Sequence, residues 1–119
     1  MDDPVGGHDQ LMKAALGVPS RIASILLAHS PDIVASGQLL VRPVLDFDLI
    51  LAGHTHGGQV NLPGLSAAWL HPGLGGEYNQ GFFQIRESRM YVNRGIGMTT
   101  IPVRVASSPE VTLFTLEKR

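Results

Sequence analysis

The stretch Asp48-Leu-Ile-Leu-Ala-Gly-His-Thr-His-Gly-Gly-Gln59 runs an apolar segment directly into two histidines. Residues 49–52 form a continuous apolar run, which is typical of a strand buried on both faces of a sheet. Side chains two residues apart on an extended backbone point the same way, so His54 and His56 are expected to face one spot. Gly53 permits a sharp turn after the strand. The stretch therefore predicts two histidines at the carboxyl edge of a central strand, where α/β proteins usually keep their sites.

A second apolar segment ends in the same manner. Residues 22–28 are expected to form a strand that leads into His29, and Ser30-Pro-Asp32 follows. Ser30 can cap a helix that begins there, and the proline suits its first turn. Neutral imidazole is a common ligand for zinc, manganese or iron. Two strands that each end in histidine therefore predict one shared metal site. The alternative is that these histidines are only hydrogen-bonded members of polar loops.

The rest of the chain extends an α/β pattern. The other expected elements are a helix over residues 9–16, a long glycine- and proline-rich loop over 63–79, and strands over 81–86, 89–93 and 110–117. Glu87 and Ser88 are expected to form the two-residue turn of a hairpin. His8 and His71 lie in loops and are expected to be exposed, outside any site.

Composition restricts the class of protein. The chain has 119 residues, enough for one domain, and its 44% hydrophobic and 16% charged residues exclude wholesale disorder. A net charge of −1 without basic runs argues against nucleic acid as a partner, and no cysteine is present. No apolar run approaches the roughly 20 residues of a membrane span, so no membrane segment is expected and the chain as written would be cytoplasmic.

Five motifs in a fixed order carry a family resemblance. They are Ala28-His-Ser-Pro-Asp32, residues 49–59, Tyr91-Val-Asn-Arg-Gly-Ile-Gly97, Pro102-Val-Arg104 and Pro109-Glu-Val111. Together they resemble the carboxyl-terminal part of the catalytic domain of calcineurin-like metallophosphoesterases, in particular the small bacterial branch. The resemblance covers nearly the whole chain. It implies an α/β fold with a mixed sheet, namely the carboxyl-terminal half of an α/β/β/α sandwich, with residues 1–119 as a partial domain.

The same resemblance implies a chemistry. Such enzymes are hydrolases that cleave phosphodiester or pyrophosphate bonds by metal-activated hydroxide, with two divalent ions of manganese, iron or zinc. By resemblance, His29 and His54 would serve one metal and His56 the other, while Gln59 and Arg94 would face the phosphoester substrate. An arginine suits that role because its planar fork matches phosphate oxygens. Full-length relatives would include membrane-associated or exported proteins.

The family's other metal motifs do not occur in this sequence. It contains no Asp-x-His, no Gly-Asp and no Asn-His. Two dications held about 3.5–4 Å apart need an anionic bridge, which three neutral imidazoles do not supply. We therefore expect a truncated domain that binds at most one metal and is inactive alone. The alternatives are a catalytically silent remnant, or a binding module that recognises a partner through residues 63–79. Exposed sheet edges would favour self-association.

Overall fold

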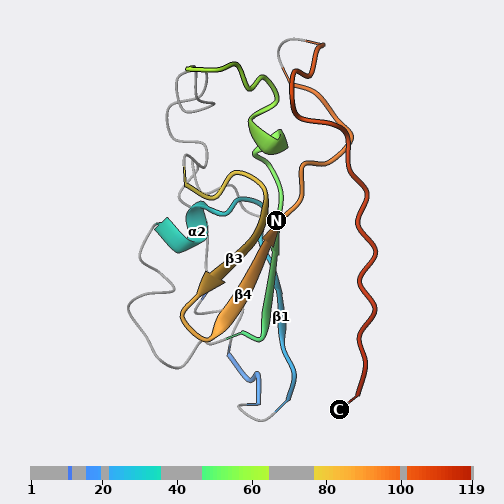
Figure 1. The fold of residues 1–119 in the computed structure, drawn as a ribbon. Helices are drawn as coiled ribbons and strands as arrows, with labels where there is room; N and C mark the ends of the chain where they lie inside the picture. The colour runs from blue at the N-terminus through green and yellow to red at the C-terminus, as the bar shows by residue number, and fades with distance from the viewer. Residues whose placement is uncertain are drawn as a thin grey trace.

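The computed structural model describes residues 11, 16–19, 22–35, 47–64, 77–99 and 102–118. Within these ranges lie strands β1 (Ile25–Leu27), β2 (Leu49–Ala52), β3 (Gly81–Ile85) and β4 (Ser88–Val92), helix α2 (Asp32–Ala35) and the 3-10 helix η2 (His56–Gly58) (Figure 1). The described strands form one four-stranded sheet in the order β1-β2-β4-β3. Strand β2 is parallel to β1 and to β4, whereas β3 is antiparallel to β4. The expected mixed α/β fold is confirmed.

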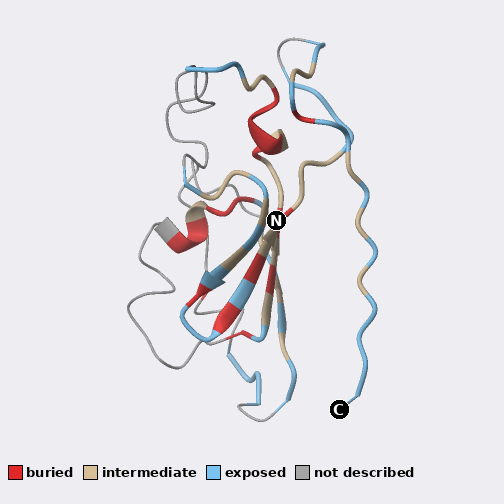
Figure 2. Cartoon of the chain, in the orientation of Figure 1, coloured by how far each residue is buried: buried red, intermediate tan, exposed pale blue. Residues whose placement is uncertain are grey.

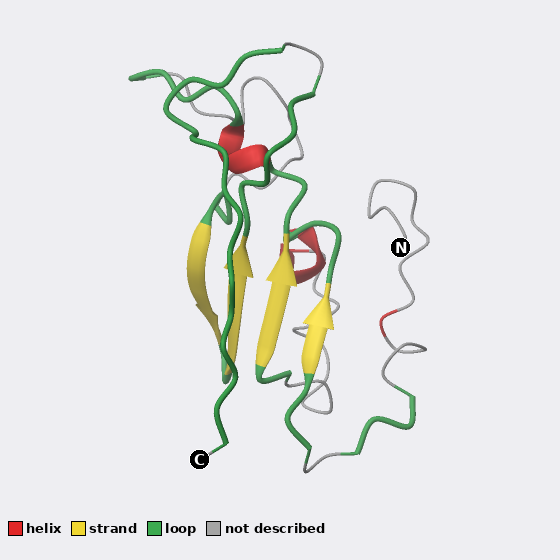
Figure 3. Ribbon diagram, turned by 90° about the vertical axis from the view of Figure 1, so that its right-hand side faces the viewer, coloured by secondary structure: helices red, strands yellow, loops and turns green. Residues whose placement is uncertain are grey.

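Strand β2 owes its central place to its apolar sequence. Ile50 and Ala52 are buried on one face of the sheet, while Leu49 and Leu51 on the other face are half-buried. The predicted burial on both faces is therefore complete on one face only. Figure 3 gives the reason: α2 lies on one side of the sheet, and on the other side runs the extended carboxyl-terminal segment.

The core of the described residues lies between the sheet and α2 (Figure 2). Its buried apolar side chains are Leu11, Ile33, Val34, Phe47, Ile50, Ala52, Ile85, Met90 and Val92. The helix starts as expected, because Ser30 Oγ accepts a hydrogen bond from Asp32 N at 3.2 Å and donates one to Asp32 Oδ2 at 2.7 Å. This cap satisfies a backbone donor in the first turn and turns Ile33 and Val34 toward the sheet.

Strand β1 is shorter than the expected strand over 22–28. Directly before β1, Ser24 is bound by the side chain of Asp48. Asp48 Oδ2 accepts hydrogen bonds from Ser24 N at 2.8 Å and from Ser24 Oγ at 3.3 Å. The carboxylate takes the place of a ladder partner at this point. In the described sheet β1 and β3 occupy the two edges. Self-association through those edges stays a prediction.

The β3–β4 hairpin turns one residue earlier than the sequence predicted. Ile85 pairs with Ser88, so the two turn residues are Arg86 and Glu87, and the prediction of Glu87-Ser88 is wrong. Arg86 adopts a left-handed φ of 55°, a conformation that two-residue hairpin turns require. Ser88 belongs to β4 because it pairs with Ile85, and it is buried there. The expected helix over 9–16 and loop over 63–79 lie mostly outside the described residues.

The carboxyl-terminal segment 110–117 is extended, but it does not join the described sheet as a strand. Its side chains alternate, with Thr112 and Phe114 half-buried and Val111 and Leu113 exposed. The Phe114 ring packs edge-on against Tyr91 of β4, with 5.2 Å between centroids. The predicted alternation is correct as far as Phe114 and ends there, because Leu116 is 72% exposed. The assignment of the segment to a strand is wrong. Aromatic packing and the hydrogen bonds of Thr112 with the side chains of Tyr91 and Asn93 hold it on the open sheet face, in place of ladder hydrogen bonds.

Replacing Phe114 by alanine should loosen this segment. Because the ring packs against two aromatic side chains of the hairpin, Phe82 and Tyr91, we expect the free energy of unfolding to fall by about 1–2 kcal/mol. Limited proteolysis should then cut the segment faster. Leu113→Ala is the matched control, since Leu113 is 90% exposed. Equal losses in urea unfolding for both variants would contradict the packing argument.

Candidate metal centre

Two histidines meet at the carboxyl edge of the parallel strands. The ladder between β1 and β2 continues past both strands, because Ala28 N donates to Leu51 O at 2.9 Å and Gly53 N donates to His29 O at 3.2 Å. This register places His29 beside the residues that follow β2. The ring centroids of His29 and His54 are 4.3 Å apart, with their planes tilted by 49°. The structure therefore brings these two imidazoles together, as the sequence predicted from two strands that each lead into a histidine.

His56 departs from the arrangement that its spacing predicted. Both His54 (φ 69°) and His56 (φ 52°) have left-handed backbones, and Thr55 between them is helical. Thr55 Oγ1 accepts from Gly57 N at 3.2 Å and donates to Asn79 O at 2.7 Å, which fixes a tight turn. The expected extended backbone through His54 and His56 is wrong, because the chain leaves the extended conformation directly after β2. That both rings face one spot stays a prediction.

The ring of His56 is held by a second loop. Its Nδ1 lies 3.1 Å from the backbone oxygen of Gly97. A carbonyl oxygen only accepts hydrogen bonds, so this contact requires the proton on Nδ1 and leaves the lone pair on Nε2. A histidine that ligates a metal commonly donates its other ring N–H to such an acceptor. In this tautomer Nε2 of His56 is the ring nitrogen with a lone pair that could bind a metal.

The turn after β2 contains unusual backbone conformations. His54, His56 and Gln59 all have positive φ values, between 50° and 69°. Non-glycine residues pay roughly 1–3 kcal/mol for such conformations, which persist only where the surroundings impose them and which cluster at functional sites. These conformations therefore favour the turn of residues 53–59 as the place to look for a functional site.

Gln59 fastens the turn to the loop that contains Thr99. Its side chain is buried, and Gln59 Nε2 donates to Thr99 O at 2.9 Å. Thr99 N in turn donates to Gln59 Oε1 at 2.7 Å. Both atoms of the amide thus bond within the protein, which gives Gln59 a structural part in the site. Its contact with substrate stays a prediction.

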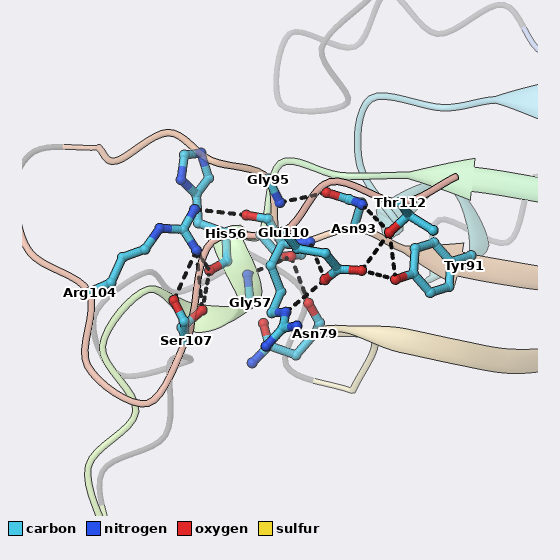
Figure 4. A network of polar contacts seen from close by, with 12 residues as sticks. His56, Gly57, Asn79, Tyr91, Asn93, Gly95, Arg104, Ser107, Glu110 and Thr112 are labelled. Carbon is cyan, nitrogen blue, oxygen red and sulfur yellow. Dashed lines mark hydrogen bonds and ion pairs between the residues drawn. The ribbon is translucent and has the colours of Figure 1, made fainter. Parts of the chain in front are cut away.

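Arg94 forms an ion pair with Glu110. Arg94 Nε lies 2.7 Å from Glu110 Oε2, and the two side chains are 30% and 14% exposed. Glu110 also bonds to the hydroxyls of Tyr91 and Thr112, so its carboxylate is well anchored (Figure 4). This pair uses Nε and orients the guanidinium. A phosphate contact through its terminal nitrogens stays a prediction.

The imidazole pair is an incomplete ligand set for a metal. Catalytic zinc sites use three protein ligands and structural zinc sites four. Within the parts of the chain that the structure describes, no group of three or more His, Cys, Asp or Glu side chains could hold a metal ion. His29 and His54 bring two imidazoles together, a ligand type that suits a borderline cation such as zinc. In the described residues His56 does not complete a group of three with them.

Comparison with known proteins identifies the family. The chain is 39% identical over 117 residues to the uncharacterized metallophosphoesterase YkuE of Bacillus subtilis, covering 98% of this chain and 39% of that protein. It is 37% identical over 113 residues to a Bos taurus transmembrane protein with metallophosphoesterase domain, covering 93% of this chain and 24% of that protein. It is 33% identical over 97 residues to the phosphodiesterase YaeI of Escherichia coli, covering 82% of this chain and 33% of that protein. This chain belongs to the calcineurin-like metallophosphoesterase family.

The match covers most of this chain but only part of each of these metallophosphoesterases. The chain spans between about a quarter and two fifths of each of the relatives it matches. No protein-family model matches it, and no solved structure gives a significant match. Among the residues that the structure describes, no helix has the length and apolar character needed to cross a bilayer.

Sequence reasoning missed three residues that organise the region around His56 and Arg94. Arg104 and Ser107 hold the segment after β4 against the turn that bears His56, and Glu110 anchors Arg94 (Figure 4). Two of them lie in motifs of the family resemblance, Pro102-Val-Arg104 and Pro109-Glu-Val111, which was the available signal. Their contacts are with backbone atoms and with residues far along the chain, which spacing alone does not reveal.

Gly57 is required where these two segments touch. It has a φ of 60°, and a Cβ there would lie 2.5 Å from Arg94 Cγ and 2.7 Å from Ser107 Oγ. Gly57→Ala should therefore lower the free energy of unfolding by about 2–4 kcal/mol through clash and strain together. Gly64→Ala is the matched control, because Gly64 also has a positive φ (81°) but a Cβ added there would meet nothing within 4 Å. Equal losses in urea unfolding would contradict the close packing.

Proposed function

We propose that this chain is the histidine-bearing part of a metal-dependent phosphoesterase that hydrolyses phosphodiester or pyrophosphate bonds. The observation that carries the proposal is the pair of rings of His29 and His54, 4.3 Å apart at the ends of two parallel strands. The names of the relatives, metallophosphoesterase and phosphodiesterase, support the reaction class. His29, His54 and His56 are the proposed metal ligands.

The proposed ligands suit the reaction. A bound divalent cation would stabilise charge on the phosphoryl oxygens and generate the nucleophile from water near neutral pH. The chain's own part is to present imidazole nitrogens: His54 from the half-buried turn after β2, and His56 with its proton fixed on Nδ1 by Gly97 O. Arg94, oriented by Glu110, would bind a substrate phosphate through its terminal nitrogens.

The proposed ligand set is short of a complete two-metal site. Imidazoles do not screen two dications from each other, so we propose that these residues alone hold one cation and that full activity needs carboxylate ligands in addition. The sequence lacks the Gly-Asp motif that would carry a bridging carboxylate. The same deficit favours the alternative function, a catalytically silent remnant that binds one metal.

Zinc titration by calorimetry tests the stoichiometry. We expect about one tightly held ion per chain near pH 7, because one position has two or three nitrogen donors. Two tightly held ions would contradict the argument from the absent bridge. No binding at all would contradict the metal site itself.

Hydrolysis of an aryl phosphodiester with added manganese separates the phosphoesterase from the silent remnant. We expect turnover by the chain alone to be no greater than that of its His54→Ala variant, because the carboxylate ligands are missing. Turnover that is lost in His54→Ala would refute the silent-remnant alternative and would show that these residues are active alone. A matched His71→Ala variant controls for loss of an unrelated histidine.

A further inference from the structure

The guanidinium of Arg104 is surrounded by backbone carbonyls. Its Nη2 donates to Gly97 O at 2.6 Å and to Arg94 O at 2.8 Å, and its Nε donates to Gly97 O at 3.0 Å. Its Nη1 donates to His56 O and to Ser107 O, both at 3.2 Å. Four carbonyls from two separate segments thus share one planar fork. The fork of this arginine therefore joins the segment that contains Arg94, Gly97 and Ser107 to the turn that contains His56.

The shortest hydrogen bond of Arg104 is to the carbonyl of Gly97, which also contacts the ring of His56. Gly97 O accepts from Arg104 at 2.6 Å and lies 3.1 Å from His56 Nδ1. A charged donor fixes the position of this oxygen, and the oxygen fixes the ring and its tautomer. Arg104 therefore acts on His56 through Gly97.

The backbone of His56 is held by the same group of residues. Its carbonyl oxygen accepts from Ser107 Oγ at 2.7 Å as well as from Arg104 Nη1. His56 has a left-handed φ of 52°, which persists only when its surroundings impose it. Arg104 thus restrains both ends of this residue, the carbonyl directly and the ring through Gly97.

We propose that Arg104 is a positioning residue that sets the orientation and the Nδ1–H tautomer of His56, so that Nε2 is presented for metal coordination. The proposal rests on the proposed function in one respect, the role of His56 as a ligand. Among the described residues the ion pair of this region is Arg94 with Glu110, whereas Arg104 bonds to carbonyl oxygens. A lysine would keep the charge of Arg104 but lacks the fork that reaches several carbonyls together.

Long-range proton–nitrogen NMR of the histidine rings in the metal-free chain, at about pH 8 where imidazole is neutral, tests the tautomer directly. We expect the wild-type His56 ring to carry its proton on Nδ1. In Arg104→Lys we expect the His56 signals to move toward the average of both tautomers, while the backbone spectrum stays dispersed. A wild-type His56 protonated on Nε2, or an Nδ1–H tautomer that Arg104→Lys leaves unchanged, would overturn the proposal.

Zinc affinity supplies the second readout. Loss of a partner that orients a metal ligand typically weakens binding about 10–100-fold, and we expect Arg104→Lys to fall in that range. Arg89→Lys, an exposed arginine of β4, should leave the affinity unchanged. In a His56→Ala background, Arg104→Lys should have no further effect. An equal loss with and without His56 would show that Arg104 does not act through it.

The two readouts separate this inference from the proposed function. If the wild-type chain binds no zinc while the tautomer responds to Arg104→Lys as expected, the metal role fails and the positioning of His56 stands. If zinc binds and depends on His54 but not on Arg104, the metal role stands and the positioning role fails.

Discussion

Replacing His54 with alanine should weaken zinc binding by this chain about 100-fold or more. Loss of a residue that only orients a metal ligand typically lowers metal affinity about 10–100-fold. His54 is itself a proposed ligand, one of the two imidazoles that meet at the strand ends. Its removal should therefore lower the affinity by about 100-fold or more. Competition against a chromophoric chelator at neutral pH measures the affinity. His29→Ala should have a similar effect.

The control for this loss is another histidine. His71 lies outside the proposed ligand set, so His71→Ala should bind zinc as tightly as the unaltered chain. Unchanged affinity in His54→Ala would contradict the proposed site. So would an equal loss in His71→Ala, because zinc would then be held without regard to the strand ends.

The second large effect is expected in the core. Met90 is fully buried, in register with Ile50 of β2 on one side and Phe83 of β3 on the other. Met90→Ala should lower the free energy of unfolding by about 2–5 kcal/mol, the range for buried large-to-small changes. The free energy of unfolding of a small domain is roughly 5–15 kcal/mol in total, so a large fraction of the variant molecules would be unfolded in mild denaturant.

Urea unfolding followed by circular dichroism measures this loss. Arg89→Ala is the matched control, since Arg89 is the preceding residue of β4 and is exposed on the opposite face. It should change the free energy of unfolding by no more than about 0.5 kcal/mol. Equal midpoints for Met90→Ala and the unaltered chain would contradict the burial of Met90 between the sheet and α2.

The elements that the sequence predicted well are those with a local signal. The apolar run of β2, the cap at Ser30 and the hairpin of β3 and β4 each depend on neighbouring residues, and each is present. The meeting of His29 with His54 followed from one further rule, that parallel strands end at the same edge of a sheet. Register then supplies the contact without any further information.

The parts that sequence reasoning missed depend on distant contacts. The direction of His56 is set by Thr55, by Asn79 and by the loop at Gly97, none of which spacing reveals. The segment 110–117 alternates like a strand as far as Phe114, yet side-chain contacts with Tyr91 and Asn93 attach it to the sheet, not ladder hydrogen bonds. Alternation reports which side chains face the protein and does not report whether the backbone pairs.

X-ray absorption on the zinc-loaded chain tests most directly whether these histidines converge on one cation. We expect two or three imidazole nitrogens at about 2.0–2.1 Å from the metal, and one fewer in the His54→Ala variant. A first shell made of oxygen alone, or a nitrogen count that His54→Ala leaves unchanged, would contradict that convergence.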